Sequence, residues 1–241
     1  MKRALDILVS SLLLVFLLPI IGTFALAVFL QDFKSPFYLG DRVGRNSTNF
    51  KMIKLRSMIK NADKSGVNST SSNDQRITPV GSLIRKIKLD ELTQLLNVLN
   101  GTMSLVGPRP QVAEDVSLYS EEEKELLTVR PGITDFSSII FSDEGDILKE
   151  FEDPDLGYQQ LIRPWKSKLG LIYINNQSVW LDLKLIFFTA YSIINRKLVL
   201  NSLVKQLQKL SIDNDILEIA SRKNTLVPSI APGKDEIFHS R

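Results

Sequence analysis

Asp90 and Glu91 follow directly after a group of basic residues, and this cluster is where the sequence could do chemistry. The cations are Arg85, Lys86 and Lys88. Positions 86 and 90 are neighbours on a helix, so the simplest interpretation is a solvated helix face with one Lys86–Asp90 ion pair. The alternative is a reactive site, because a carboxylate among cations stays ionised and can act as a nucleophile toward phosphorus.

Three further segments carry arginine or lysine, two of them beside proline and glycine: Lys54–Arg56, Gly107–Pro110 and Arg130–Gly132. Arginine forks match the oxygens of a phosphate, and neighbouring prolines hold the backbone that aims them. A second carboxylate next to the first could hold Mg²⁺, which prefers hard oxygen ligands. Together these patterns indicate phosphoryl transfer.

The composition of the 241 residues excludes several other chemistries. There is no cysteine, which excludes a disulfide scaffold, a thiolate zinc site and a cysteine nucleophile. The single histidine, His239, is third from the end, so a catalytic triad would require the tail to fold back. Acid–base chemistry therefore relies on carboxylates, lysine or tyrosine. Hydrophobic residues make up 44% of the chain, which predicts a folded core.

The segment before these motifs is apolar and has basic residues on both sides. Residues 7–30 carry no charge, and as a helix they would extend about 36 Å, enough to cross a hydrocarbon core of about 30 Å. Pro19 lies in the middle, where proline breaks or kinks a helix. The flanking lysines and arginines place both ends in the cytoplasm by the positive-inside tendency. A helix–break–helix hairpin in one leaflet fits both observations; an ordinary kinked transmembrane helix is the alternative.

The elements expected around the motifs form a mixed α+β domain. Hydrophobic periodicity and turn residues predict them in chain order. They are short strands within 35–58, one helix over 83–99, a strand within 103–110, a turn at 130–134, an amphipathic helix over 179–194 and a tail with little structure from 222 to 241. The amphipathic helix could pack in a core or lie on a membrane surface.

Several segments, read together, resemble the bacterial sugar transferase family, the monotopic phosphoglycosyl transferases that initiate glycan assembly on polyprenyl phosphate. Besides the apolar helix with Pro19, the segments are KRALDI at 2–7, FKMIKLRSM at 50–58, RKIKLDELTQLLNVLNGTMSLVGPRP at 85–110, RPGIT at 130–134 and VWLDLKLI at 179–186. The resemblance covers residues 1–197, and the block at 85–110 is its most specific part.

The resemblance implies a fold, a location and partners. The expected fold is α+β, with a re-entrant membrane helix at 1–33, a compact and mainly helical catalytic domain with short strands and interfacial amphipathic helices at 34–199, and a C-terminal extension at 200–241. The expected location is the cytoplasmic face of the bacterial inner membrane. The implied partners are a UDP-sugar, polyprenyl (undecaprenyl) phosphate and inner-membrane lipid. A homodimer is left open, and no nucleic acid is expected.

The resemblance also implies a reaction. The family moves a sugar-1-phosphate from a UDP-sugar to polyprenyl phosphate, releases UMP, and so initiates a surface glycan such as a capsule, an exopolysaccharide or lipopolysaccharide. Carried onto this chain, Asp90 would attack the phosphate attached to the sugar and form a phosphosugar–aspartyl intermediate. The lipid phosphate would then attack that intermediate. Glu91 would bind Mg²⁺.

Further positions match the family by sequence. Arg85 matches a phosphate-contacting arginine, Lys54 and Arg109 match basic positions near the site, and Arg56 and Arg130 are additional candidates for phosphate binding. Pro19 matches the break in the membrane helix. Departures from the family pattern are Leu18 for Ser, Ile87-Lys88 for Thr-Ser, Thr93 for Pro, Thr102 for Asp and Asp135–Phe141 for a Gly-Trp-Ala-Gln segment. We expect these to affect sugar specificity and local helix geometry.

Two other functions compete with this one. The first is a catalytically inactive membrane-surface scaffold of the same fold, whose basic residues bind anionic lipid. The second is a membrane-tethered nucleic-acid binder, which needs a basic face with stacking aromatics. Aromatic residues make up only 8% of the chain, so this class ranks last.

Overall fold

The computed structural model describes residues 1–67 and 69–239. The first half of the chain contains α1 (Lys2–Asp32), β1 (Phe37–Val43), η1 (Arg45–Ser47), β2 (Asn49–Leu55), η2 (Ala62–Ser65), α2 (Pro79–Lys86), η3 (Leu89–Gln94), α3 (Leu95–Asn100), β3 (Ser104–Val106) and α4 (Ala113–Ser117). The second half contains α5 (Glu121–Lys124), η4 (Glu125–Thr128), β4 (Gly132–Thr134), α6 (Phe136–Ile140), α7 (Glu144–Leu148), α8 (Pro154–Gly157), η5 (Tyr158–Ile162), α9 (Arg163–Asn175), α10 (Val179–Ser192), α11 (Arg196–Lys209) and α12 (Asn214–Ser221).

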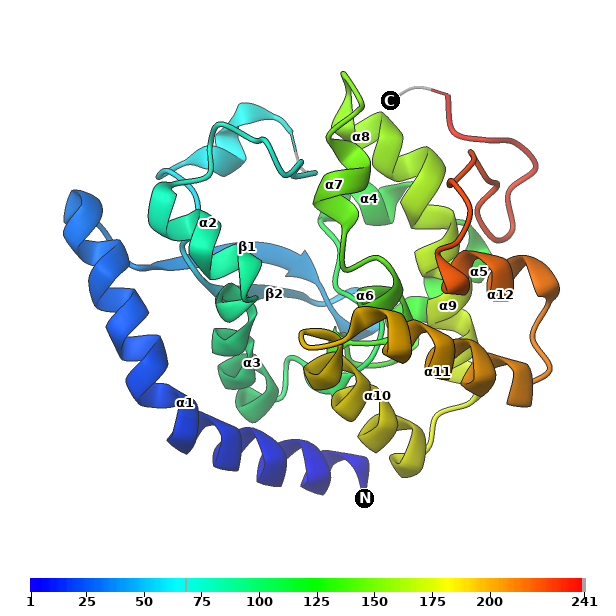
Figure 1. The fold of residues 1–241 in the computed structure, drawn as a ribbon, viewed down its shortest axis with the longest axis horizontal. Helices are drawn as coiled ribbons and strands as arrows, with labels where there is room; N and C mark the ends of the chain where they lie inside the picture. The colour runs from blue at the N-terminus through cyan, green and yellow to red at the C-terminus, as the bar shows by residue number, and fades with distance from the viewer. Residues whose placement is uncertain (68, 240–241) are drawn as a thin grey trace.

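Helices dominate the described residues, and four short strands form two small sheets, which confirms the mixed α and β composition (Figure 1). Strands β1 and β2 pair antiparallel, with Phe37 opposite Leu55 and Val43 opposite Asn49. Asn46 in the connecting turn has a φ of 54°, a left-handed conformation that asparagine tolerates better than most residues. The short strands predicted within 35–58 are confirmed, and they pair as a hairpin.

Strands β3 and β4 form a parallel pair, so the prediction of a plain turn at 130–134 was wrong. Gly107 and Gly132 explain the pairing. The Gly107 amide donates to the Thr134 carbonyl, and the Gly132 amide donates to the Pro108 carbonyl, both at 3.0 Å. A Cβ added to Gly132 would lie 2.1 Å from the Gly107 nitrogen, so only glycine allows the two backbones to approach.

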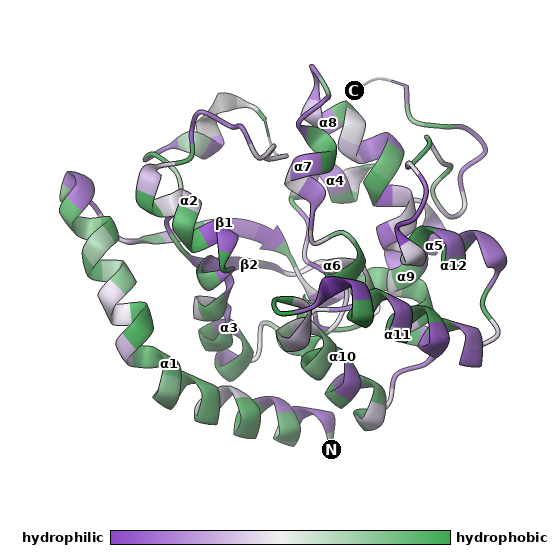
Figure 2. Ribbon diagram, in the orientation of Figure 1, coloured by the Kyte–Doolittle hydropathy of each residue, from purple (hydrophilic) through white to green (hydrophobic). Residues whose placement is uncertain are grey.

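Helix α1 runs along one side of the molecule and is visibly bent (Figure 1), and it is apolar along most of its length (Figure 2). It is the one helix among the described residues that is long and apolar enough to cross a membrane. The chain remains helical from Lys2 to Asp32 through Pro19. The expected interruption is therefore a bend within a continuous helix. Proline removes a backbone donor without ending the helix here.

The beginning of α1 is bonded to the globular part of the chain. Lys2 Nζ donates to Asp182 Oδ2 at 2.7 Å, and the buried Asp6 accepts from Ser104 Oγ at 2.9 Å. Arg3 donates to two carbonyls at the C-terminal end of α3, where a cation also offsets the helix dipole. These contacts dock the first two turns of α1 on β3, α3 and α10.

The end of α1 is bonded to the same globular part. Arg56, which follows β2, is only 7% exposed. Its two terminal nitrogens donate to Asp32 at 2.7 and 2.6 Å, and its Nε donates to the Ser35 carbonyl at 2.8 Å. Both ends of the apolar helix are therefore held by one domain.

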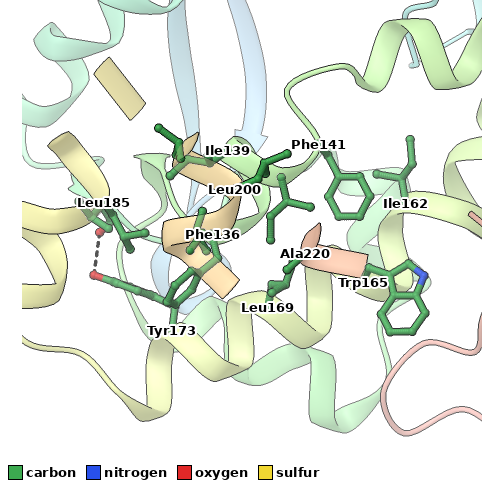
Figure 3. Packing of buried hydrophobic residues seen from close by; sticks show 14 of the residues in the cluster. Phe136, Ile139, Phe141, Ile162, Trp165, Leu169, Tyr173, Leu185, Leu200 and Ala220 are labelled. Atoms are coloured by element: carbon green, nitrogen blue, oxygen red, sulfur yellow. Dashed lines mark hydrogen bonds between the residues drawn. The ribbon is translucent and has the colours of Figure 1, made fainter. Parts of the chain in front are cut away.

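Side chains from α6, α9, α10, α11 and α12 meet in one core beside the sheets (Figure 3). Labelled members in Figure 3 include Phe136, Ile139, Trp165, Leu169, Tyr173, Leu185, Leu200 and Ala220. The domain boundary expected after residue 199 falls inside α11, whose residues Leu200, Leu203 and Leu207 are buried in this core.

The segment from 222 to 239 forms neither helix nor strand, as expected for the tail. It nevertheless packs against the domain. Leu226 and Ala231 are buried, and Ser120 Oγ donates to the Pro232 carbonyl at 2.6 Å. Residues 240 and 241 of the predicted tail lie outside the described residues.

Candidate active site

The single helix predicted over 83–99 is interrupted just before Asp90, so that prediction was wrong in its middle. Helix α2 ends at Lys86, and Lys88 has a φ of 56°. The amides of Ile87 and Lys88 bond back to the turn before them, which closes α2. The chain then restarts as η3, and Asp90 lies in the first turn of this new element.

Asp90 is only 7% exposed, and the solvated helix face paired with Lys86 was therefore the wrong interpretation. Its carboxylate faces Lys54 of β2, with Oδ2 at 3.9 Å from Nζ. Burial raises the pKa of Asp90 above its ordinary value; Lys54 opposes this rise, and the Glu91 carboxylate adds to it. Thr93 Oγ1 donates to the Ile53 carbonyl at 3.0 Å and so ties η3 to β2.

Glu91 forms an ion pair with Arg109, whose Nη2 donates to Glu91 Oε1. Burial alone would raise the pKa of Glu91, but Arg109 and Lys54 outweigh it and bring the pKa to about 2. Glu91 in turn raises the pKa of Arg109. Burial and the Arg109 charge lower the pKa of Lys54. The two adjacent carboxyls thus differ: Glu91 is held ionised, whereas Asp90 takes up a proton at a higher pH than an ordinary aspartate does.

A cavity of about 290 Å³ brings these groups together. Five of the seven residues predicted for catalysis or phosphate binding line it: Lys54, Arg85, Asp90, Glu91 and Arg109. They come from β2, α2, η3 and the Pro-rich segment after β3. Because these elements are separate in sequence, the cavity depends on the hairpin and η3 packing together.

The other two predicted residues lie elsewhere. Arg56 binds Asp32 at the end of α1. Arg130 donates from Nε to the Gly101 carbonyl at 2.8 Å and lines a second cavity with Lys2 and Arg3. The structure does not bring either side chain to the cavity of Asp90.

Lys88 of the basic cluster also lines the Asp90 cavity, together with charged residues that the sequence motifs did not single out: Arg42, Asp115, Glu144 and Lys166. Lys166 pairs with Glu144, and Asp115 accepts from Gln159 Nε2 at 2.7 Å. Strand periodicity could have found Arg42. Arg42 lies opposite Phe50 in the hairpin, and Phe50 and Lys54 lie on the same face of β2, because alternate residues of a strand share a face. Arg42 therefore lies on the same face as Lys54.

The donor set is compatible with a magnesium ion held partly by substrate. Among the described residues, there is no cluster of three or more Asp, Glu or His side chains that could hold a metal ion by itself. Mg²⁺ is commonly bound by one or two carboxylates together with substrate phosphates. Arg109 takes Glu91 Oε1, and Oε2 has no hydrogen-bond partner in the described part of the chain. Glu91 therefore has one oxygen to offer.

Comparison with known proteins places the chain in a family. The bacterial sugar transferase family matches residues 1–196, so the chain belongs to that family. The chain is 32% identical over 196 residues to the UDP-N-acetylgalactosamine-undecaprenyl-phosphate N-acetylgalactosaminephosphotransferase of Aeromonas hydrophila, covering 80% of this chain and 43% of the relative. It is 33% identical over 199 residues to the UDP-glucose:undecaprenyl-phosphate glucose-1-phosphate transferase of Escherichia coli (strain K12), covering 79% and 39%.

A shorter relative matches over most of its length. The exopolysaccharide production protein ExoY of Rhizobium meliloti (strain 1021) is 32% identical over 203 residues, covering 78% of this chain and 83% of the relative. The chain spans less than half the length of the two phosphotransferases above. The family match over residues 1–196 includes all residues that line the cavity, from Arg42 to Lys166.

Proposed function

We propose that this chain transfers a sugar-1-phosphate from a UDP-sugar to undecaprenyl phosphate and releases UMP. One observation carries the proposal: Asp90 lies buried in a cavity whose walls present several phosphate-suited cations, among them Lys54, Arg85 and Arg109. The names of the relatives, which pair a nucleotide sugar with undecaprenyl phosphate, support the same substrates.

In the first step, Asp90 Oδ attacks the phosphorus attached to the sugar. An aspartyl O–P bond forms, the P–O bond to UMP breaks, and the electron pair leaves with UMP. Lys54 favours the ionised form of Asp90, which the attack requires. In the second step, a phosphate oxygen of the lipid attacks the same phosphorus, and the Asp90 carboxylate is released.

Glu91 and Arg109 offset the negative charge of the substrate phosphates, Arg109 directly and Glu91 by holding Mg²⁺. Arg109 presents a guanidinium to the cavity while its ion pair fixes the position of Glu91. Arg85 adds a second guanidinium, and such groups stabilise charge that develops on phosphate oxygens. A bound Mg²⁺, held by Glu91, would supply further neutralisation of the diphosphate.

The proposal includes a re-entrant α1 that enters the membrane from the cytoplasmic side and leaves by the same side. Lys2 and Asp6 hold its first turns, and Arg56 holds Asp32 at its last turn. A helix of 31 residues is about 46 Å long and could otherwise cross the bilayer. Contacts from one domain to both ends support a return to the same face, and the bend gives the geometry for it.

The test uses the purified 241-residue chain in detergent with undecaprenyl phosphate, Mg²⁺ and a panel of UDP-sugars, with UMP release as the measurement. Asp90→Asn should abolish release. The matched control is Asp41→Asn, because Asp41 is an exposed carboxylate on β1 outside the cavity and forms an ion pair with Lys51. Full turnover by Asp90→Asn would refute the nucleophile.

A second measurement isolates the intermediate. Without the lipid acceptor, the chain incubated with a UDP-sugar labelled in the sugar should gain covalent label, seen as a mass increase of one sugar phosphate. Asp90→Asn should gain none. If no UDP-sugar gives release or label while the chain binds vesicles, the inactive scaffold is the better account.

A further inference from the structure

A second cavity, of about 240 Å³, lies beside the beginning of α1 and shares no lining residue with the cavity of Asp90. Four cations line it: Lys2, Arg3, Arg45 and Arg130. They come from α1, the hairpin turn and the segment before β4. A cavity of this size holds far more than one water, which occupies about 30 Å³.

Two of the four cations already bond to the protein through their terminal nitrogens. Lys2 Nζ donates to Asp182, to the Tyr173 hydroxyl and to a backbone carbonyl. Arg3 donates to two carbonyls of α3. These bonds fix the wall of the cavity, and they engage all three N–H groups of Lys2 and one N–H on each terminal nitrogen of Arg3.

Arg45 and Arg130 differ, because each uses only its Nε. Arg45 Nε donates to the Thr128 carbonyl at 3.0 Å, and Arg130 Nε donates to the Gly101 carbonyl at 2.8 Å. Within the described residues, the terminal nitrogens of both guanidinium groups have no hydrogen-bond or ion-pair partner. The bond at Nε holds each side chain in place and leaves the two terminal nitrogens of its guanidinium group available to a ligand.

The described lining of the cavity carries an excess of positive charge. Four cations line it together with one acid, Asp6, whose carboxylate accepts from Ser104 Oγ and the Leu105 amide. The site therefore favours an anion, and paired guanidinium forks match the oxygens of a phosphate.

The surroundings of the cavity indicate where that phosphate comes from. Leu8, on the next turn of α1, is 69% exposed, and Trp180, at the start of α10, is 76% exposed. The Lys2–Asp182 bond keeps these two helix starts together. Exposed tryptophan with exposed leucine is typical of the level where lipid headgroups meet acyl chains.

We propose that this cavity binds the phosphate of an anionic phospholipid headgroup, with Arg45 and Arg130 as the recognising groups. The site is separate from the one that binds the reacting phosphates. It fixes the depth of the α1 and α10 starts at the membrane surface, and it gives Arg130 a role that the active-site cavity does not.

The experiment titrates the 241-residue chain in a non-ionic detergent by calorimetry with three probes: short-chain phosphatidylglycerol, short-chain phosphatidylcholine and inorganic phosphate. We expect saturable binding of phosphatidylglycerol that is tighter than that of either other probe. Arg45→Gln and Arg130→Gln should each weaken it about tenfold, the effect of losing charge-assisted hydrogen bonds. Lys34→Gln is the matched control, since it removes one exposed charge at the other end of α1.

The outcomes separate the alternatives. Equal weakening by Lys34→Gln would reduce the effect to general surface charge and overturn the site. Inorganic phosphate binding as tightly as phosphatidylglycerol would overturn the lipid assignment, as would equal affinity for phosphatidylcholine. Arg130→Gln also removes the bond to Gly101, whereas Arg45 is exposed and its side chain bonds to the Thr128 carbonyl at the surface. An unchanged affinity in correctly folded Arg45→Gln therefore counts against the proposal by itself.

Discussion

Lys54 Nζ lies 3.9 Å from Asp90 Oδ2, so the cation nearest the proposed nucleophile comes from a strand far away in sequence. The separation is longer than a hydrogen bond and short enough for a strong electrostatic effect. Lys54 can therefore favour the ionised carboxylate without occupying the oxygen that attacks. Glu91 has the opposite arrangement, since Arg109 bonds it directly.

This relationship predicts how activity depends on pH. Because Lys54 lowers the pKa of Asp90 against the rise caused by burial, Lys54→Met should let Asp90 take up its proton at higher pH. The acidic limb of kcat/KM for UMP release should move upward, and activity at neutral pH should fall about 10²-fold. Lys51→Met on the same strand is the control, because Lys51 pairs with Asp41 outside the cavity. An unmoved acidic limb in Lys54→Met would contradict the assignment.

The two carboxyls should have opposite effects on stability. Asp90 has a raised pKa in the folded chain, so stability is lost as pH rises through that pKa, and Asp90→Asn should raise the free energy of unfolding at neutral pH. Glu91 has its pKa lowered from 4.5 to about 2, so its contribution is present above 4.5 and lost as pH falls toward 2. Glu91→Gln should cost about 1–3 kcal/mol at neutral pH.

Tryptophan fluorescence during thermal unfolding in detergent measures both changes. Glu121→Gln provides the baseline, because Glu121 is exposed and should change stability by less than about 0.5 kcal/mol. If Asp90→Asn and Glu91→Gln shifted the free energy of unfolding in the same direction, the raised pKa of Asp90 and the lowered pKa of Glu91 would not both hold.

Much of the fold could be predicted from the sequence wherever one physical signal dominated. The short strands of the hairpin followed from a Gly/Asn turn between them, and the apolar helix followed from its composition. The interruption at Lys88 could not be predicted, because the apolar period continues across it and lysine does not favour a positive φ. The β3–β4 pair was missed because it rests on a close approach of two glycines distant in sequence.

The candidate site was predictable for Lys54 and for the charged residues of the block at 85–110. Asp90, Glu91, Arg85 and Arg109 lie in one block of sequence, and the structure brings them to one cavity. Arg56 and Arg130 carry the same charge in similar motifs, yet the fold uses one to hold α1 and directs the other to a second cavity. Residue type and spacing identify a basic side chain, but only packing decides what it faces.

Lys88 combines a charge that lines the cavity with a backbone that suits glycine better. Lys88→Gly and Lys88→Ala both remove the ammonium group, but only alanine keeps the cost of a positive φ. Glycine should therefore be more stable than alanine by about 1 kcal/mol. Both should raise KM for the UDP-sugar to a similar extent, because both lose the same charge near the diphosphate. Steady-state kinetics and thermal unfolding separate the two effects, and different KM values would mean that the backbone itself positions the substrate.

The C-terminal segment should contribute to stability although it has no regular structure. Leu226 is buried in the core cluster, whereas its neighbour Val227 is 63% exposed. Leu226→Ala should lower the free energy of unfolding by about 2–3 kcal/mol, and Val227→Ala should change it by less than about 0.5 kcal/mol. Denaturant unfolding of the full chain measures both. Equal values would mean that the segment detaches in solution.

The two anchored ends of α1 predict a labelling pattern. The chain has no cysteine, so single cysteines can be introduced at Ala4, Leu18 and Lys34 without background. Ala4 and Lys34 are exposed near the two anchored ends, and Leu18 is exposed in the apolar middle. In membrane vesicles of known orientation, an impermeant maleimide should label Ala4→Cys and Lys34→Cys from the cytoplasmic side only. Leu18→Cys should stay unlabelled until detergent is added, because lipid covers it. Labelling of the two ends from opposite sides would require at least one set of contacts, Lys2–Asp182 or Arg56–Asp32, to be absent in the membrane, and α1 would then span it.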